Sequence, residues 1–311
     1  MTLTITILLL ALSCVMLLKG ADWLVTGATG IAYRWGIPYI IVGLTFVAMG
    51  TSMPELAVSI ISELKGSADI AVGNIIGSNI LNIWLILGIS SVAAVVAVNK
   101  TNLKFEIPLV IISAVLLFFL GRDGRISLVD GIILLAVFAA YFINLLVGAR
   151  LSKQTVKRNK VRNYPMWQNV VFTVVGAVLI IAGSLLAVKE ASNLARAAGM
   201  SERFIGLTIV AFGTSLPELF TSVVAARQGN SELAIGNIVG SNIFNILFVI
   251  GLAAVIVPLP FNVNFRVDTV IAAFAGIVLL IFALKKKLGK PAGFTMLALY
   301  AVYLGYLIKT L

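Results

Sequence analysis

The sequence contains no histidine and only one cysteine, Cys14, among its 311 residues. The lack of histidine excludes histidine-based zinc sites and Ser-His catalytic triads built within this chain. A single cysteine excludes a disulfide framework. Charged residues are also scarce, at 11% of the chain, while 60% of the residues are hydrophobic. Soluble domains carry about 25% charged residues, so the composition predicts a polytopic membrane protein.

The formal net charge is +11, which in a soluble chain would suggest a nucleic-acid partner. In a membrane protein the same excess reflects topology, because cytoplasmic loops are enriched in Lys and Arg. We therefore expect membrane lipid around the chain and no nucleic-acid partner. The N-terminus lacks the basic region of a signal peptide, so the first apolar stretch is interpreted as a membrane helix.

Apolar segments that are long enough to span a bilayer, about 20 residues each, recur ten times. They are predicted at 3–32, 38–64, 69–98, 104–121, 128–149, 167–199, 203–227, 232–258, 268–285 and 292–310. A basic stretch separates five segments from five. The predicted parts are an N-terminal half at 1–149, a cytoplasmic linker at 150–166 and a C-terminal half at 167–311. Because five is odd, homologous halves must insert in opposite orientations, which predicts an all-α fold of two inverted five-helix repeats.

The charges of the loops favour one orientation in the cell membrane. With both termini outside, the inward loops and the linker hold 14 Lys and Arg residues, and the outward loops and ends hold 8. This bias predicts that the N- and C-termini lie outside and that the linker is cytoplasmic.

Two stretches of the chain are copies of one another. Residues 43–88 and 206–251 align without a gap at an offset of 163 residues, and 24 of the 46 positions are identical. The identical positions include Gly, Thr, Ser, Pro, Glu and Asn, several of which are costly in a membrane. A duplicated polar motif in two halves predicts a transporter with one shared site near the midplane.

In each copy a proline and a glutamate interrupt a membrane segment. Pro54 has no N–H for the carbonyl of Gly50, so the second segment is predicted to break there, and the seventh segment repeats the pattern. The freed carbonyls are predicted oxygen ligands for a cation, because broken backbone at membrane depth lines a cavity or is buried in protein. Leaving a glutamate ionised at mid-span costs roughly 3 kcal/mol or more. The matched pair Glu55 and Glu218 therefore indicates function.

The third and eighth segments carry a second polar pattern. It comprises Asn74, Ser78 and Asn82 in the first copy and Asn237, Ser241 and Asn245 in the second. A spacing of four places each set on one helix face. These side chains could be ion ligands. Alternatively, they could form hydrogen bonds that hold membrane helices together. The tying role also applies to Asn79 and Asn242, which lie off this stripe.

The predicted ligands are all oxygen atoms. Ca²⁺ takes six to eight oxygens in flexible geometry, whereas the chain offers no Cys or His ligand set for zinc or copper. Two carboxylates balance one Ca²⁺ or two Na⁺. Because the two glutamates would repel each other in an empty site, protons are plausible competitors. We expect no cofactor beyond the transported ions.

The paired GTS-x-PE and GN-x-x-GSN-x-x-N motifs resemble the two alpha repeats of the calcium/cation antiporter superfamily, most closely its prokaryotic sodium/calcium exchanger branch. The two repeats cover 92 residues. The resemblance implies a secondary antiporter that exchanges Na⁺ for Ca²⁺ by alternating access at one midplane site.

The resemblance also implies residue roles. Glu55 and Glu218 would be the central carboxylates that hold Ca²⁺. The other implied site residues are Thr51 and Thr214 as Ca²⁺ or Na⁺ ligands, Ala48 and Ala211 as carbonyl donors, Ser78 and Ser241 as peripheral Na⁺ ligands, Ser52 and Ser215 as neighbours, and Asn82 and Asn245 as the midplane pair. Many exchangers carry aspartate at the position of Asn245. The number of Na⁺ ions per Ca²⁺ therefore stays open.

Three other functions remain as alternatives. A Ca²⁺/H⁺ antiporter is favoured by the missing aspartate and disfavoured by the lack of further acidic residues in the motifs. A cation channel would need a continuous pore or a symmetric oligomer, whereas an inverted duplication indicates a carrier. An intramembrane enzyme is disfavoured because Thr, Ser and Asn are typical of ion coordination. We expect a transporter, not an enzyme, without an obligate protein partner.

Overall fold

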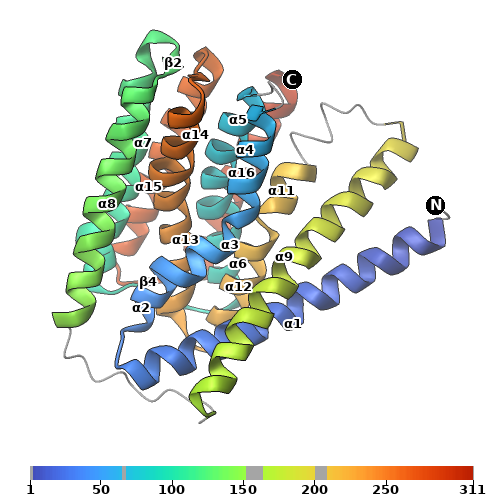
Figure 1. Cartoon of the computed structure of the whole chain (residues 1–311), viewed down its shortest axis with the longest axis vertical. Coiled ribbons are helices and arrows are strands. Elements are labelled where there is room, and N and C mark those ends of the chain that lie inside the picture. The colour runs from blue at the N-terminus through green and yellow to red at the C-terminus, as the bar shows by residue number, and fades with distance from the viewer. Residues whose placement is uncertain (1–2, 65–67, 152–163, 200–208, 311) are drawn as a thin grey trace.

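The structure is a computed structural model that describes residues 3–64, 68–151, 164–199 and 209–310, and it is a bundle of long helices (Figure 1). The helices are α1 (Leu3–Trp35), α2 (Tyr39–Val42), α3 (Ala48–Thr51), α4 (Met53–Leu64), α5 (Ala68–Leu81), α6 (Leu87–Ala93), α7 (Ile107–Leu120), α8 (Leu128–Leu151), α9 (Met166–Ala197), α11 (Ala211–Thr214), α12 (Leu216–Arg227), α13 (Ser231–Ile243), α14 (Gly251–Ile256), α15 (Val263–Ala283) and α16 (Lys290–Thr310). Wider π-helical turns join some of them: η1 (Gly43–Val47), η2 (Asn82–Ile86), η3 (Asn102–Glu106) and η6 (Phe244–Ile250), and a 3₁₀ turn, η4 (Gly121–Asp123), follows α7. Several membrane spans are therefore built from two or three short helices in line.

The described helices confirm the predicted all-α polytopic class. Eight are long and apolar enough to cross a membrane, and a ninth span is added when Tyr39–Thr51 and Met53–Glu63, which meet at a bend of 41°, are taken as one. The predicted segment 203–227 begins outside the described residues, so the count of ten remains a prediction. The same holds for the division at the linker 150–166, most of which also lies outside the described residues.

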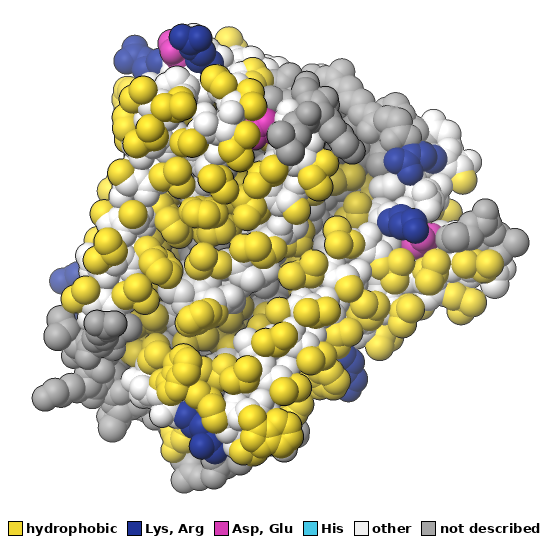
Figure 2. Space-filling view, in the orientation of Figure 1, with side chains coloured by type: hydrophobic (Ala, Val, Ile, Leu, Met, Phe, Trp, Pro, Cys, Tyr) yellow, Lys and Arg dark blue, Asp and Glu magenta, His cyan; other side chains and the backbone are white. Residues whose placement is uncertain are grey.

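The surface of the bundle is apolar. Large side chains such as Val302 and Phe46 are 72% and 67% exposed, and Figure 2 shows hydrophobic side chains over the middle of the molecule with Lys and Arg toward its margins. A protein in water rarely exposes so much continuous apolar surface. This face is suited to contact with lipid.

Two predicted boundaries are wrong in an informative way. The ninth segment begins at Val263 instead of 268, because the Oδ1 of Asn262 accepts a hydrogen bond of 3.2 Å from the backbone N–H of Phe265 and caps the helix. The third segment ends at Ala93 instead of 98, since the chain turns there into a short strand.

Short strands join the two halves of the chain. Strand β1 (Val96–Ala97) pairs antiparallel with β4 (Lys287–Leu288), and β2 (Arg125–Ile126) pairs antiparallel with β3 (Leu259–Pro260). Strands β1 and β3 follow helices α6 and α14, and the other two occupy equivalent loops before α8 and α16. Each ribbon therefore connects one half to the other, as expected for a two-fold related pair.

Helices α1 and α9 form a long oblique pair beside the remaining bundle (Figure 1). Their backbones approach closely at glycine: a Cβ atom on Gly20 would lie only 2.9 Å from the carbonyl oxygen of Gly176, and one on Gly183 would lie 3.0 Å from the Cβ of Met16. Small residues are the usual means by which membrane helices come so close. The pair is thus a preformed unit that packs against the broken helices.

The predicted breaks lie at serines that precede the prolines by two residues. Ser52 has φ −84° and ψ 9°, and Ser215 has φ −90° and ψ 4°, both in the sparsely populated bridge region. Pro217 cannot donate to the carbonyl of Gly213. That carbonyl instead accepts a hydrogen bond of 2.6 Å from the hydroxyl of Ser184 on α9. The α1–α9 pair is therefore tied directly to the break.

We predict that Ser184→Ala destabilises the protein. It removes a buried donor from the Gly213 carbonyl, which costs about 1–3 kcal/mol, and the midpoint of thermal unfolding of the purified protein should fall by several degrees. Ser113→Ala is the matched control, because the buried Ser113 hydroxyl donates 2.9 Å to the carbonyl of Val110 within its own helix. Equal midpoints for the two variants would contradict the role given to Ser184.

Candidate cation site

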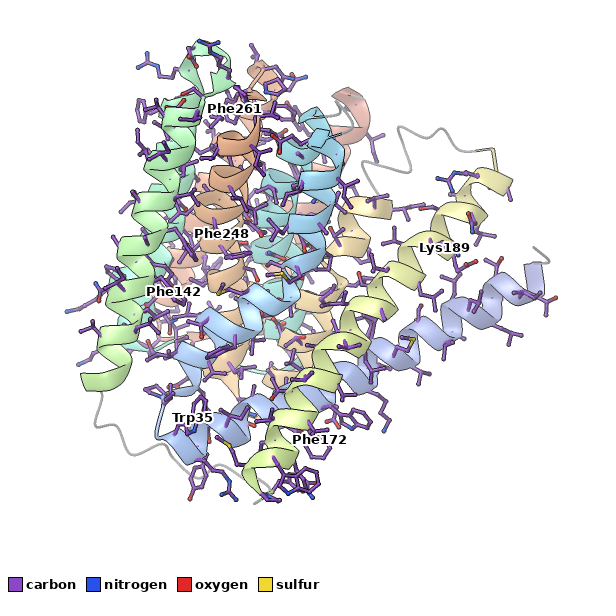
Figure 3. All side chains as sticks on the ribbon, viewed as in Figure 1. Trp35, Phe142, Phe172, Lys189, Phe248 and Phe261 are labelled. Atoms are coloured by element: carbon purple, nitrogen blue, oxygen red, sulfur yellow. The ribbon has the colours of Figure 1, made fainter. Side chains whose placement is uncertain are left out.

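The duplicated motifs meet at the centre of the bundle, on the breaks α3–α4 and α11–α12 and on the buried helices α5 and α13. Helix α13 approaches the second span through glycine: a Cβ atom on Gly240 would lie 2.8 Å from the Cβ of Ala48 and 2.9 Å from the carbonyl oxygen of Leu44. Gly240 therefore lets helix α13 pack closely against the second span. In Figure 3 the side chains of these central helices fill the middle of the bundle.

The two glutamates are fully buried, and each is bonded by the other half of the chain. The hydroxyl of Ser215 donates 3.1 Å to Oε1 of Glu55, and the hydroxyl of Ser52 donates 2.8 Å to Oε1 of Glu218. Both serines occupy the breaks. The break in one half thus supplies the hydrogen-bond donor for the carboxylate of the other half.

The threonines of the motif make a second reciprocal pair of contacts. The hydroxyl of Thr51 donates 3.1 Å to Oδ1 of Asn237, and that of Thr214 donates 3.3 Å to Oδ1 of Asn74. The Thr51 hydroxyl also lies 3.2 Å from the carbonyl oxygen of Ala48. The first asparagine of each predicted polar stripe therefore faces the break of the opposite half.

The serines of the stripe complete the surroundings of the carboxylates. The hydroxyl of Ser241 lies 3.3 Å from Oε1 of Glu218 and 3.4 Å from the carbonyl oxygen of Ala48. The hydroxyl oxygen of Ser78 lies 3.2 Å from that of Ser215. Ser241 thus lies next to Glu218, and Ser78 lies next to the serine that bonds Glu55.

The last asparagines of the stripes sit in the π-helical turns η2 and η6, a geometry that is frequent at functional sites. The side-chain NH₂ of Asn82 donates 3.0 Å to Oδ1 of Asn242, and that of Asn245 donates 3.1 Å to Oδ1 of Asn79. The off-stripe asparagines, which the sequence offered as helix ties, therefore bond the midplane pair directly.

Within the described part of the chain, four buried oxygen atoms of the glutamates and the midplane asparagines have no hydrogen-bond partner: Oε2 of Glu55, Oε2 of Glu218, Oδ1 of Asn82 and Oδ1 of Asn245. They form two pairs related by the repeat. Among the described residues no lysine or arginine forms an ion pair with either carboxylate. Because an unpaired buried carboxylate is costly, a cation or protons at this centre would stabilise it.

Eleven of the twelve predicted site residues have described side chains, and all eleven take part in the contacts given above. The exception is Ala211, which begins α11 but whose side chain lies outside the described set. The carbonyl of Gly213, one of the freed carbonyls expected as ligands, accepts a hydrogen bond from Ser184, and its role as a ligand stays a prediction. Sequence reasoning missed Ser184, although the proline pattern implied that a carbonyl needed a donor.

The two halves differ in one repeated contact. In the C-terminal half the NH₂ of Asn237 donates 2.9 Å to the hydroxyl of Ser222. In the N-terminal half the equivalent atoms, Nδ2 of Asn74 and Oγ of Ser59, have no partner. The repeats therefore adopt different local conformations around the same site.

The sodium/calcium exchanger protein family matches residues 5–147 and 168–309 of the chain. The chain is 37% identical to the inner membrane protein YrbG of Escherichia coli, with 80% of this chain and 79% of that protein covered. It is 30% identical to the sodium/calcium exchanger MaX1 of Methanosarcina acetivorans, with 90% and 91% covered. A structure of the sodium-calcium exchanger NCX_Mj, soaked with 100 mM Na⁺ and 10 mM Sr²⁺, matches with a TM-score of 0.87 and 30% identity over 98% of this chain and 99% of that one.

We predict that Ser52→Ala and Ser215→Ala each weaken Ca²⁺ binding by about ten-fold, because one donor that orients a carboxylate is lost. Isothermal titration of the purified protein with Ca²⁺ measures this change. Ser90→Ala is the control, since the Ser90 hydroxyl is equally buried but has no partner. Unchanged affinity in both break variants would show that the serines do not orient the carboxylates for binding.

Proposed function

The chain belongs to the sodium/calcium exchanger family, and we propose that it is a secondary antiporter that exchanges Na⁺ for Ca²⁺ at one site between its two halves. As a member of that family it is a membrane ion exchanger and not an enzyme. The observation that carries the proposal is the set of four unpartnered buried oxygens on Glu55, Glu218, Asn82 and Asn245. Two carboxylate and two amide oxygens are ligands that a hard cation prefers.

The charge of the site explains exchange. Two carboxylates without basic partners balance one Ca²⁺ or two Na⁺, so the two kinds of ion compete for the same oxygens. Because only one kind of ion occupies the site at a time, the movement of Ca²⁺ in one direction is coupled to the movement of Na⁺ in the other. The ligand set of this proposal is Glu55, Glu218, Thr51, Thr214, Ala48, Ala211, Ser52, Ser215, Ser78, Ser241, Asn82 and Asn245.

Alternating access is the proposed route of transport. Inverted repeats that exchange conformations open a central site first to one side of the membrane and then to the other. The unequal contacts of Asn237 and Asn74 support this view, since one half makes a bond that its counterpart lacks. In this scheme the α1–α9 pair moves across the four motif helices.

A Ca²⁺/H⁺ antiporter is the second candidate. The midplane pair is Asn82 and Asn245, so the two glutamates carry all the negative charge of the ligand set. Protons would neutralise two unpaired carboxylates as effectively as two Na⁺ would. The coupling ion is therefore tested by experiment together with the site.

The chain is multi-pass, and we propose that it resides in the cell membrane with both termini outside and the linker 150–166 in the cytoplasm. Its partners are the transported cations and the surrounding lipid. We propose no cofactor and no obligate protein partner.

We predict that the protein, reconstituted in proteoliposomes, takes up radioactive Ca²⁺ when Na⁺ is loaded inside. Glu55→Gln and Glu218→Gln should each reduce uptake to background, because each removes half of the negative charge that binds Ca²⁺. Glu63→Gln is the matched control, since Glu63 is buried on the same helix as Glu55 but has alanine at its repeated position. It should retain uptake.

The driving gradient decides between the two candidates in the same assay. Uptake with an outward H⁺ gradient and none with an outward Na⁺ gradient would establish the Ca²⁺/H⁺ antiporter. Uptake that survives both glutamine substitutions would overturn the site.

We also predict the orientation of the loops. In a Cys14→Ser background, Arg125→Cys at the start of β2 should react with a membrane-impermeant maleimide in intact cells. Lys285→Cys, between α15 and β4, should react only after the membrane is permeabilised. Both positions are exposed, so the reversed pattern of labelling would show the opposite topology.

A further inference from the structure

We propose that Asn79 and Asn242 are positioning residues that hold Asn82 and Asn245 as neutral oxygen ligands. This inference rests on the proposed cation site and deepens it. Asn79 and Asn242 are themselves buried, at 2% and 0% exposure, and they lie outside the ligand set. Their effect on the ion acts through the amides that they bond.

The backbone fixes the orientation of the two positioning side chains. The NH₂ of Asn79 donates 3.1 Å to the backbone carbonyl of Asn242, and the NH₂ of Asn242 donates 3.2 Å to the backbone carbonyl of Asn79. A carbonyl accepts and never donates, so each side chain must turn its nitrogen toward the opposite backbone. The Oδ1 atom of each then points the other way.

That orientation determines the next pair. Oδ1 of Asn79 can only accept, and it accepts from the NH₂ of Asn245 at 3.1 Å, while Oδ1 of Asn242 accepts from the NH₂ of Asn82 at 3.0 Å. The midplane amides must therefore direct their nitrogens at the positioning residues. Their own oxygens remain unpartnered and buried, which is the state of a ligand ready for a cation.

The same series of hydrogen bonds explains why position 245 holds asparagine and not aspartate. An ionised aspartate there has no hydrogen to donate to Oδ1 of Asn79. Two acceptor oxygens would then face each other in a buried site, which is unfavourable. The four asparagines thus form a self-consistent set of uncharged ligands and supports, in which the glutamates alone balance the charge of the ion.

The bonds cross between the halves, and this gives a sharp test. Asn79 acts on Asn245 and not on its neighbour Asn82, although Asn82 is only three residues away. Substitutions of residues that act as one unit show non-additive effects in a double-mutant cycle. For independent residues, the fold-losses of affinity caused by the two substitutions multiply. Asn79→Ala and Asn245→Ala should each lower Ca²⁺ affinity by about ten-fold, and the double variant should be no weaker than either single one.

The control cycle pairs Asn79→Ala with Asn82→Ala, and here the losses should multiply to about a hundred-fold. Titration calorimetry of the purified protein with CaCl₂ measures every affinity. Thermal unfolding without Ca²⁺ is recorded in parallel. If the bond between Asn79 and Asn245 were merely structural, the double-mutant cycle would be non-additive in the unfolding midpoints and not in the Ca²⁺ affinities. If Asn79→Ala fails to fold, the mirror pair Asn242 and Asn82 supplies an independent cycle with the same expectation.

The outcomes separate this inference from the proposed function. Full Ca²⁺ affinity in Asn79→Ala, or multiplied losses in the cycle of Asn79 with Asn245, would overturn the positioning role. Retained Ca²⁺ binding in Glu55→Gln and Glu218→Gln would instead overturn the cation site itself. Loss of binding in the glutamine variants together with a non-additive Asn79 and Asn245 cycle supports both.

Discussion

The reciprocal bonds between break serines and glutamates are the interaction on which the rest of the structure depends. The hydroxyl of Ser52 donates to Glu218 and that of Ser215 donates to Glu55, so each carboxylate takes a hydrogen bond from the opposite half. Burying a carboxylate without donors is expensive in a medium that contains no water. The halves are therefore held in one register by the polar centre, and the apolar surface around them only has to match the lipid.

The helix breaks make these bonds geometrically possible. An unbroken helix directs every backbone group along its own axis, whereas the residue at a break has its side chain and its neighbours' carbonyls turned sideways. Proline creates the break, and serine in the bridge conformation places a hydroxyl at it. The π-helical turns act similarly for Asn82 and Asn245, because a wider turn changes which residues share a face. Polar atoms thus converge at the middle of spans that remain apolar toward lipid.

Much of this organisation is readable from the sequence. Membrane physics allows few architectures, and a gapless duplication marks which polar residues share a site, so the class of fold and the set of central residues were predictable. What could not be read is which residue bonds which. Asn79 and Asn242 lie off the helical stripe and become part of the centre only through contacts between halves. The start of α15 depends on one capping side chain, and the two-residue strands have no periodicity that could reveal them.

The imperfect part of the duplication carries its own meaning. If the halves were identical in sequence, the two conformations of an inverted repeat would be related by a two-fold rotation and equal in energy. Here Ser184 bonds the break of the C-terminal half, but the repeated position in α1 is Ala21, which has no hydroxyl. If the halves exchanged conformations, the hydrogen bond from Ser184 to the Gly213 carbonyl would be lost, and Ala21 could not form its equivalent in the other half. In the proposed alternating-access scheme, the sequence differences between the copies would make the two states unequal in energy, so that one of them would be the preferred resting conformation.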